Sequence, residues 1–385
     1  MTEKLYYKDS HIHEFTARVL TCEKGKKGFA VTLDRTAFFP EGGGQPADTG
    51  SIGPALVTDV QEREGEILHY VNQSLEPGTE YACALDAEQR LRRMQNHSGE
   101  HVVSGITHRL YGYDNVGFHM GTECMTIDFS GELSWEQLME IETLANRAVW
   151  DNIPVRTSFP PAEALAAMEY RSKLELTHDV RVVEIPGIDR CACCAPHVKS
   201  TGEIGVIKIQ AAERHRGGVR VSLVCGMDAL EDYRRKQENV TAISELLSVK
   251  RDSTASAVER VLGEQTRQKE RIGELSMELA RLKDAGFPYT EGNICVFDNV
   301  LDEVALRELV NLLAEKCTGA AAAFSGSDET GYLYIIGSRN VDLRARSREI
   351  NSAICGKGGG SPEMIRGRAM STAEKIRKVM ENGAV

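Results

Sequence analysis

The chain has 385 residues, of which 41% are hydrophobic and 27% are charged. This length is enough for two or three domains with their own cores, and the composition is that of an ordinary globular protein. There is no run of 18 or more apolar residues and no signal peptide at the N-terminus, so we expect a cytoplasmic protein that does not contact membranes. Its ten cysteines are then thiols or metal ligands rather than disulfides. The net charge of −11 excludes a protein coated in basic surface, although local basic patches can still contact RNA.

The first half of the chain predicts two different domains. Residues 1–90 consist of short β-branched segments separated by glycines and charged turns, which predicts a small β-barrel or sandwich. From Asp86 onward the apolar residues follow a helical period, and a second helix is expected after Ser134. Mixed α/β structure continues to residue 226, so we expect a second domain over residues 91–226.

The second half is expected to begin with a helical stalk. Residues 227–285 contain no proline, and their apolar residues recur at alternating steps of three and four, which predicts two helices with a break near residue 252. A helix packed on its own domain would give the same pattern. Polar Gln265 and Gln268 in the seam favour a short contact between two copies over a long coiled coil.

The last hundred residues, 286–385, alternate strands and helices around the glycine loop GKGGGSPE and predict a compact α/β domain. The expected fold class is therefore a multidomain α+β protein with a β-barrel, an α/β domain, a helical stalk and a C-terminal glycine-rich α/β domain.

Two pairs of metal-binding side chains share one spacing. His97 and His101 are four residues apart, which places both imidazoles on one face of a helix. Such pairs are often incidental, but Cys193 and His197 repeat the step in the segment CACCAPH. Three histidines and one cysteine form a nitrogen-rich tetrahedral set that suits Zn²⁺. Because catalytic zinc sites keep one position open, His197 could be a looser ligand.

Other assignments of these residues stay open. Cys191 and Cys194 have the CxxC spacing of metal ligands or of a redox pair. Glu100 precedes His101 directly, so the order differs from the HExxH helix of metalloproteases, and on a helix Glu100 need not face the ion.

A glycine loop follows the first strands, with the sequence FFPEGGGQPADTG over residues 38–50. Gly43 and Gly44 allow positive φ and close backbone approach, so their N–H groups could meet an oxyanion or a phosphate. The loop lacks the lysine of a P-loop. An ordinary turn is the alternative, but the polar Gln45 within the loop and Thr36 just before it favour a site that binds a ligand.

In this order, the segments LDRTAFFPEGGGQPADTG, NHSGEH and CCAPHVKSTGEIG resemble the editing domain of alanyl-tRNA synthetase and its free-standing relatives, the AlaX proteins. The threonyl-tRNA synthetase editing domain shares the two four-residue pairs, but the GGGQ loop points to the alanyl branch. The helical stretch and the GKGGGSPEM loop are similar to the C-terminal domain of alanyl-tRNA synthetases, as in a long AlaX form. The chain carries no aminoacylation core, so we do not expect it to charge tRNA.

The resemblance implies a role for each motif. It implies that one Zn²⁺ ion is held by four side chains, His97, His101, Cys193 and His197. It places Gln45 near the aminoacyl ester, with Gly43 and Gly44 in the same loop, and it implies that Thr36 recognises a serine hydroxyl. Between the last two ligands the family usually has Gly-Gly-Thr, whereas this chain has Cys194-Ala195-Pro196.

The implied activity is that of a zinc-dependent aminoacyl-tRNA deacylase that acts in trans on tRNA(Ala) mischarged with serine or glycine. A pocket sized for alanine rejects these amino acids by only about 1–3 kcal/mol, so a second site is needed. The resemblance also implies tRNA binding by the last domain and a homodimer through residues 227–285. Two alternatives remain: a non-catalytic tRNA-binding protein with a structural zinc, and a metal-dependent hydrolase of a small ester or amide.

Overall fold

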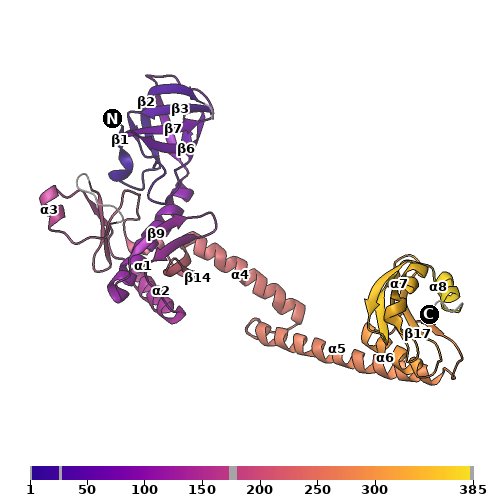
Figure 1. The fold of residues 1–385 in the computed structure, drawn as a ribbon. Helices are drawn as coiled ribbons and strands as arrows, with labels where there is room; N and C mark the ends of the chain where they lie inside the picture. The colour runs from indigo at the N-terminus through magenta and orange to yellow at the C-terminus, as the bar shows by residue number, and fades with distance from the viewer. Residues whose placement is uncertain (1, 26–27, 173–179, 382–385) are drawn as a thin grey trace. The chain divides into compact units, whose positions relative to one another are not determined.

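The computed structural model describes residues 2–25, 28–172 and 180–381, and these confirm the mixed α+β class (Figure 1). The chain divides into two compact units, Met1–Asn239 and Val240–Val385. The expected boundary at residue 90 lies inside a helix, and the one at 226 lies at the start of another, so the division into four domains stays a prediction. Within the described ranges, no helix is long and apolar enough to cross a membrane.

The first unit begins with a closed β-barrel. Its strands, in order around the barrel, are β2 (Glu14–Gly25), β3 (Gly28–Leu33), β7 (Glu66–Val71), β6 (Ala55–Arg63), β5 (Gly50–Ile52) and β8 (Glu80–Leu85). Side chains alternate along the strands, so that Val19, Val31 and Val57 fill the interior. A separate two-stranded sheet pairs β1 (Glu3–Lys4) with β4 (Arg35–Thr36). The 3₁₀ turn η1 (Leu5–Tyr7) follows β1.

A long central helix, α1 (Ala87–Tyr111), follows the barrel. Asp86 caps its first turn by accepting a hydrogen bond from Gln89 N, and Gly112 ends it with φ 70°. Every residue from Met94 to Thr107 is buried, because α1 is covered on all sides rather than along one stripe. The core of the first unit therefore contains a helix with many polar side chains.

Two sheets and a second helix surround α1. The four-stranded sheet has the order β14 (Ile207–His215), β15 (Gly218–Cys225), β10 (Met125–Phe129) and β9 (Asn115–Met120), and the three-stranded sheet has the order β11 (Arg156–Ser158), β12 (Val182–Ile185) and β13 (Asp189–Ala192). The expected helix after Ser134 is α2 (Trp135–Trp150), with a capping box between Ser134 and Gln137. Short helical segments complete this part: α3 (Ala162–Ala166) and η2 (Thr201–Ile204).

The stalk contains two helices, as its pattern predicts. α4 (Gly226–Leu247) is followed by η3 (Arg251–Ser253) and α5 (Thr254–Ala285), so the break lies at the expected place. The end of α5 packs on its own unit, since Ala280 is fully buried in a cluster with α6 (Glu303–Ala314). Earlier in α5, Val261 and Ile272 are 42% and 60% exposed, which leaves an apolar face there.

The C-terminal part of the second unit is a five-stranded sheet with helices. Its strand order is β16 (Ile294–Phe297), β17 (Ala321–Ser327), β18 (Gly331–Gly337), β20 (Met364–Ala369) and β19 (Gly356–Gly360), and its helices are α6, α7 (Leu343–Ala353) and α8 (Ala373–Glu381). The prediction of a loop over GKGGGSPE is wrong for its first five residues, because Gly356–Gly360 forms the edge strand β19. A Cβ at Gly358 would overlap the carbonyl oxygen of Arg366, so these glycines permit close pairing of backbones.

A buried ion pair attaches the glycine-loop segment to α1. Arg90 and Asp48 are each 2% exposed, and Arg90 Nε donates to both carboxylate oxygens, at 3.2 and 3.1 Å. Arg90 also donates to the carbonyl of Ala37, and Asp48 accepts from Phe39 N at 2.7 Å. Both ends of the loop segment are thereby fixed to the first turns of α1.

Loss of this pair should destabilise the first unit. We expect Asp48→Ala to lower its free energy of unfolding by about 3–5 kcal/mol, because Arg90 would stay buried without its carboxylate. Urea denaturation followed by tryptophan fluorescence measures this, since the two tryptophans of the chain, Trp135 and Trp150, both belong to the first unit.

The matched control is Glu3→Ala, which removes the exposed ion pair of Glu3 with Lys8. It should change the free energy of unfolding by less than about 1 kcal/mol. Equal effects of the two substitutions would contradict the structural role assigned to Asp48.

Candidate metal centre

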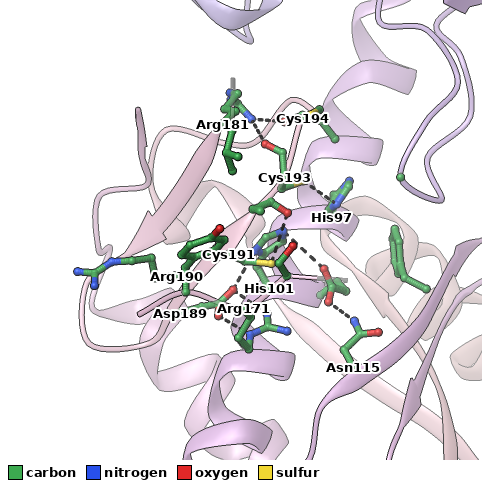
Figure 2. Close-up of a pocket in the computed structure, with 18 of the residues that line it drawn as sticks. His97, His101, Asn115, Arg171, Arg181, Asp189, Arg190, Cys191, Cys193 and Cys194 are labelled. Atoms are coloured by element: carbon green, nitrogen blue, oxygen red, sulfur yellow. Dashed lines mark hydrogen bonds and ion pairs between the residues drawn. The ribbon is translucent and has the colours of Figure 1, made fainter. Parts of the chain in front are cut away.

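Four side chains converge at the middle of α1. Ligand atoms of His97, His101, Cys193 and His197 all lie within 4.8 Å of one another. Figure 2 labels the first three of these side chains. Cys193 Sγ is 3.5 Å from His97 Nε2 and 3.4 Å from His197 Nε2. The three histidines are 2–3% exposed. The two pairs found in the sequence therefore form one cluster, and their role as metal ligands stays a prediction.

The backbone around each pair explains this convergence. His97 and His101 lie one helical turn apart, and Gly99 between them is needed because a Cβ there would overlap Cys225 Sγ. Cys193 and His197 lie in a turn after β13 that is held by Arg181, whose Nη1 donates to the carbonyls of Cys193 and Ala195, both at 2.9 Å. This turn brings the second pair to the first although it departs from Gly-Gly-Thr.

The outer nitrogen of every imidazole has a partner. His97 Nδ1 lies 2.9 Å from Gln45 Oε1, and His101 Nδ1 lies 2.9 Å from Asp189 Oδ2. His197 Nδ1 lies 3.1 Å from Ser98 Oγ. If each Nδ1 carries the hydrogen, each Nε2 offers its lone pair toward the shared centre, which is how proteins orient histidine ligands. The cluster therefore fits a metal ion with three nitrogen ligands and one sulfur ligand.

The charges of the cluster also suit metal binding. Burial acts to raise the pKa of Cys193, but the neighbouring His97 and His197 lower it well below the usual value, which favours the thiolate. Burial lowers the pKa of His197 to about 3, which keeps this imidazole neutral. Burial also acts to lower the pKa of His101, but Glu100 and Asp189 raise it well above the usual value. His101 would thus release a proton if its Nε2 became a metal ligand.

Asp189 is fixed by a second ion pair. Arg171 Nε and Nη2 donate to its two carboxylate oxygens, at 2.7 and 2.8 Å. Burial acts to raise the pKa of Asp189, but the hydrogen bonds of His101 and Arg171 lower it to about 2, so the carboxylate is charged. Neither Asp189 nor Arg171 was identified from the sequence, because both lie far along the chain from the histidine that they orient.

A second group of possible ligands overlaps the first. His101, Asp189 and Cys191 also lie within 4.8 Å of one another. Asp189 is already engaged by Arg171 and His101, and burial raises the pKa of the Cys191 thiol to about 11, so the first group is the better site. Cys191 is buried and Cys194 is exposed, and both are free thiols.

The centre borders a cavity of about 1670 Å³, large enough for a nucleoside and its ester. The aromatic side chains of Tyr6, Tyr7 and Phe39 line part of the cavity. Glu100 also lines the cavity, and its Oε2 lies 3.7 Å from His101 Nε2. The carboxylate is held from its other side by Ser104, whose Oγ donates to Oε1 at 2.7 Å. The sequence left open whether Glu100 faces the centre, and in the structure its carboxylate lies beside His101 at the cavity wall.

The glycine loop lies beside the same centre. Gly43 and Gly44 have φ 61° and 84°, and a Cβ at Gly44 would overlap the carbonyl oxygen of Phe118. Gly43 lines the large cavity and also a smaller one of about 400 Å³, which Gln45 borders. Gln45 is 1% exposed, and its Nε2 has no hydrogen-bond partner within the described residues.

Thr36 lies apart from this group. It is fully buried, its Oγ1 is 2.8 Å from His69 Nε2, and the same oxygen accepts a hydrogen bond from Phe38 N at 3.1 Å. The residues that line the large cavity do not include Thr36. Its recognition of a serine hydroxyl stays a prediction.

Comparison with known proteins shows similarity to alanyl-tRNA editing proteins and to alanine–tRNA ligases. Residues 180–221 match the family described as threonyl and alanyl tRNA synthetase second additional domain. Over 98% of its length, the chain is 28% identical to the alanyl-tRNA editing protein AlaX-L of Pyrococcus horikoshii and covers 96% of that protein. The resemblance to the AlaX family is confirmed. The chain is also similar to longer enzymes: it is 33% identical, over 95% of its length, to the alanine–tRNA ligase of Natronomonas pharaonis.

The chain spans 42% of that ligase and 44% of the alanine–tRNA ligase of Methanopyrus kandleri, to which it is 32% identical. Among solved structures, the C-Ala domain from Aquifex aeolicus alanyl-tRNA synthetase aligns with 25% of this chain and 93% of its own, with 19% identity and a TM-score of 0.20.

The outer partner of His101 should affect metal affinity. We expect Asp189→Asn to weaken Zn²⁺ binding by about 10- to 100-fold, because the amide no longer provides the charge that orients His101 Nδ1. Competition with a chromophoric chelator measures the affinity. The matched control is Glu184→Gln, which breaks the more exposed ion pair with Arg190 and should leave the affinity unchanged. An unchanged affinity in Asp189→Asn would contradict this assignment.

Proposed function

We propose that the chain is a zinc-dependent aminoacyl-tRNA deacylase that acts in trans and removes serine, and glycine, from mischarged tRNA(Ala). One observation carries the proposal. Three imidazoles with matched outer partners and one thiolate converge on the wall of a nucleoside-sized cavity that the glycine loop also lines. The likeness to an alanyl-tRNA editing protein over 98% of the chain supports the choice of substrate.

The residues present fit Zn²⁺, which His97, His101, Cys193 and His197 would hold. When bound, zinc supplies a Lewis acid that polarises an ester carbonyl or lowers the pKa of a water molecule. The chain's own residues would accept the proton of the attacking water and position the ester. Glu100 Oε2, fixed near His101 Nε2, is placed to accept the proton of the attacking water. Gly43 leaves open space beside the backbone, so that the ester can approach the N–H groups of the loop.

Gln45 and Thr36 complete the proposed site. Gln45 orients His97 through Oε1, and its Nε2 is a buried donor available to the aminoacyl group. Thr36 would recognise the serine hydroxyl after exchanging its contact with His69. A site that hydrogen-bonds the wrong amino acid discriminates better than a pocket that only excludes it by size.

The second unit supports a role in assembly and in tRNA binding. Apolar side chains on one face of α5 are 41–60% exposed at Val258, Val261, Ile272 and Leu275, which suits contact with a second copy through residues 227–285. The C-terminal α/β domain would contact the body of tRNA(Ala), with its arginines on α7 and β20.

One rival function has a specific observation in its favour. Four protein ligands would close a tetrahedral site, as in structural zinc centres, and the chain would then be a non-catalytic tRNA-binding protein. The position of Glu100 at the cavity wall favours catalysis instead.

Cys193→Ala separates these functions. We expect the full-length wild-type protein to deacylate Ser-tRNA(Ala) and Gly-tRNA(Ala) and to spare Ala-tRNA(Ala). Loss of the Cys193 ligand should lower the rate of deacylation by more than the roughly 10- to 100-fold typical of losing a residue that hydrogen-bonds to a metal ligand. Circular dichroism should show that the variant stays folded. The control is Cys194→Ala at the exposed neighbouring thiol, which should keep its activity.

Two outcomes would contradict the proposal. Unfolding of Cys193→Ala, with no deacylation by the wild-type protein, would indicate a structural zinc. Cleavage of a free seryl ester as readily as Ser-tRNA(Ala) would indicate a hydrolase of small esters.

A further inference from the structure

Arg181 is a buried cation on the wall of the large cavity. It directly precedes β12, lines the cavity and is 3% exposed. Its bonds to the carbonyls of Cys193 and Ala195 use Nη1 only, and Nε is buried with no hydrogen-bond partner in the described part of the chain. Figure 2 shows it next to Cys193 and Cys194, on the opposite side of Cys193 from His101. Within the described residues, part of the guanidinium fork therefore has no partner.

Among the described residues, no carboxylate matches the charge of Arg181. Arg171 and Arg190 line the same cavity, and each forms an ion pair with an acidic side chain. For Arg181, the described residues form no ion pair with a carboxylate, and its hydrogen bonds go to backbone carbonyls. A buried, unmatched cation is costly, so proteins keep one mainly where a ligand supplies the anion.

The nearest anionic group does not remove this imbalance. The Cys193 thiolate would share its charge with the zinc ion, which leaves Arg181 beside a site that is itself cationic. The ring of Tyr7 lies 5.3 Å from the guanidinium carbon and stabilises it only modestly. An anion supplied with the substrate would complete the charge balance.

We propose that Arg181 is a phosphate subsite, which binds the 5′-phosphate of the terminal nucleotide whose aminoacyl ester is cleaved. The assignment rests on the proposed function. Arg181 is hydrogen-bonded to the backbone of Cys193, so the subsite lies one residue away from the metal cluster. The ester and the 5′-phosphate of one nucleotide are likewise separated by a single ribose. A guanidinium fork is the side chain best suited to phosphate oxygens.

The test compares two small substrates of the zinc-loaded, full-length protein: seryl-adenosine and the same ester with a 5′-phosphate. We expect the phosphate to raise kcat/KM by about 10- to 100-fold in the wild-type protein. In Arg181→Gln this ratio should fall to about one. The ratio is the useful quantity, because loss of the bonds to Cys193 and Ala195 could lower both rates equally.

The matched control is Arg190→Gln, a cavity arginine that is already paired with Glu184 and should keep the wild-type ratio. A wild-type ratio near one overturns the proposal, and so does a wild-type ratio that survives in Arg181→Gln. If Arg181→Gln does not fold, Arg181→Lys, which keeps the charge without the fork, should still lower the ratio.

Binding measurements separate this proposal from the proposed function. We expect calorimetry to show that the wild-type protein binds AMP about tenfold or more tightly than adenosine, and that Arg181→Gln does not. This result would uphold the subsite even if Ser-tRNA(Ala) were not deacylated. Inorganic phosphate that binds as tightly as AMP would overturn the assignment to a nucleotide.

Discussion

The hydrogen bonds to the three Nδ1 atoms are the constraint on which the centre depends. A buried imidazole can turn its ring or change its tautomer, and only one arrangement directs Nε2 at the shared point. The three partners come from different parts of the first unit: Gln45 from the glycine loop, Asp189 from β13 and Ser98 from α1 itself. The site therefore forms only after loop, sheet and helix have docked, and the buried pair of Asp48 and Arg90 is one of the contacts that docks them.

Buried charge is distributed unevenly around this centre. On one side, Arg171 and Asp189 neutralise each other with two hydrogen bonds, which fixes His101 without leaving net charge. On the other side, Arg181 has backbone carbonyls and an aromatic ring as neighbours, but no carboxylate within the described residues. A purely structural site gains nothing from such an imbalance. In the proposed function, Asp189 orients a metal ligand on one side of the centre, and Arg181 binds an anionic part of the substrate on the other.

The parts of the site that sequence reasoning identified are those set by local geometry. The spacing of His97 and His101 on a helix, and the equal spacing of Cys193 and His197, needed no knowledge of distant residues. Asp189 and Arg171 act on His101 through tertiary contacts, so no short pattern reveals them. The place of Glu100 stayed open because helix periodicity gives the direction of a side chain but not what lies on that side. The role of β19 was missed because glycine marks both loops and close backbone pairing.

The backbone of the glycine loop is held in one conformation by hydrogen bonds, although its glycines would allow many. The backbones of Gly42 and Gln45 exchange hydrogen bonds at 3.1 and 3.0 Å, and Gly44 O accepts from Met120 N at 3.1 Å. Gln45 is in addition tied to His97. Of the three consecutive loop glycines, Gly43 is the one with open space beside it. The glycines therefore serve to allow left-handed backbone and close packing in a loop that is fixed before substrate arrives. Donors held in place in this way need no reorganisation during reaction, and this is the condition under which an oxyanion is stabilised most.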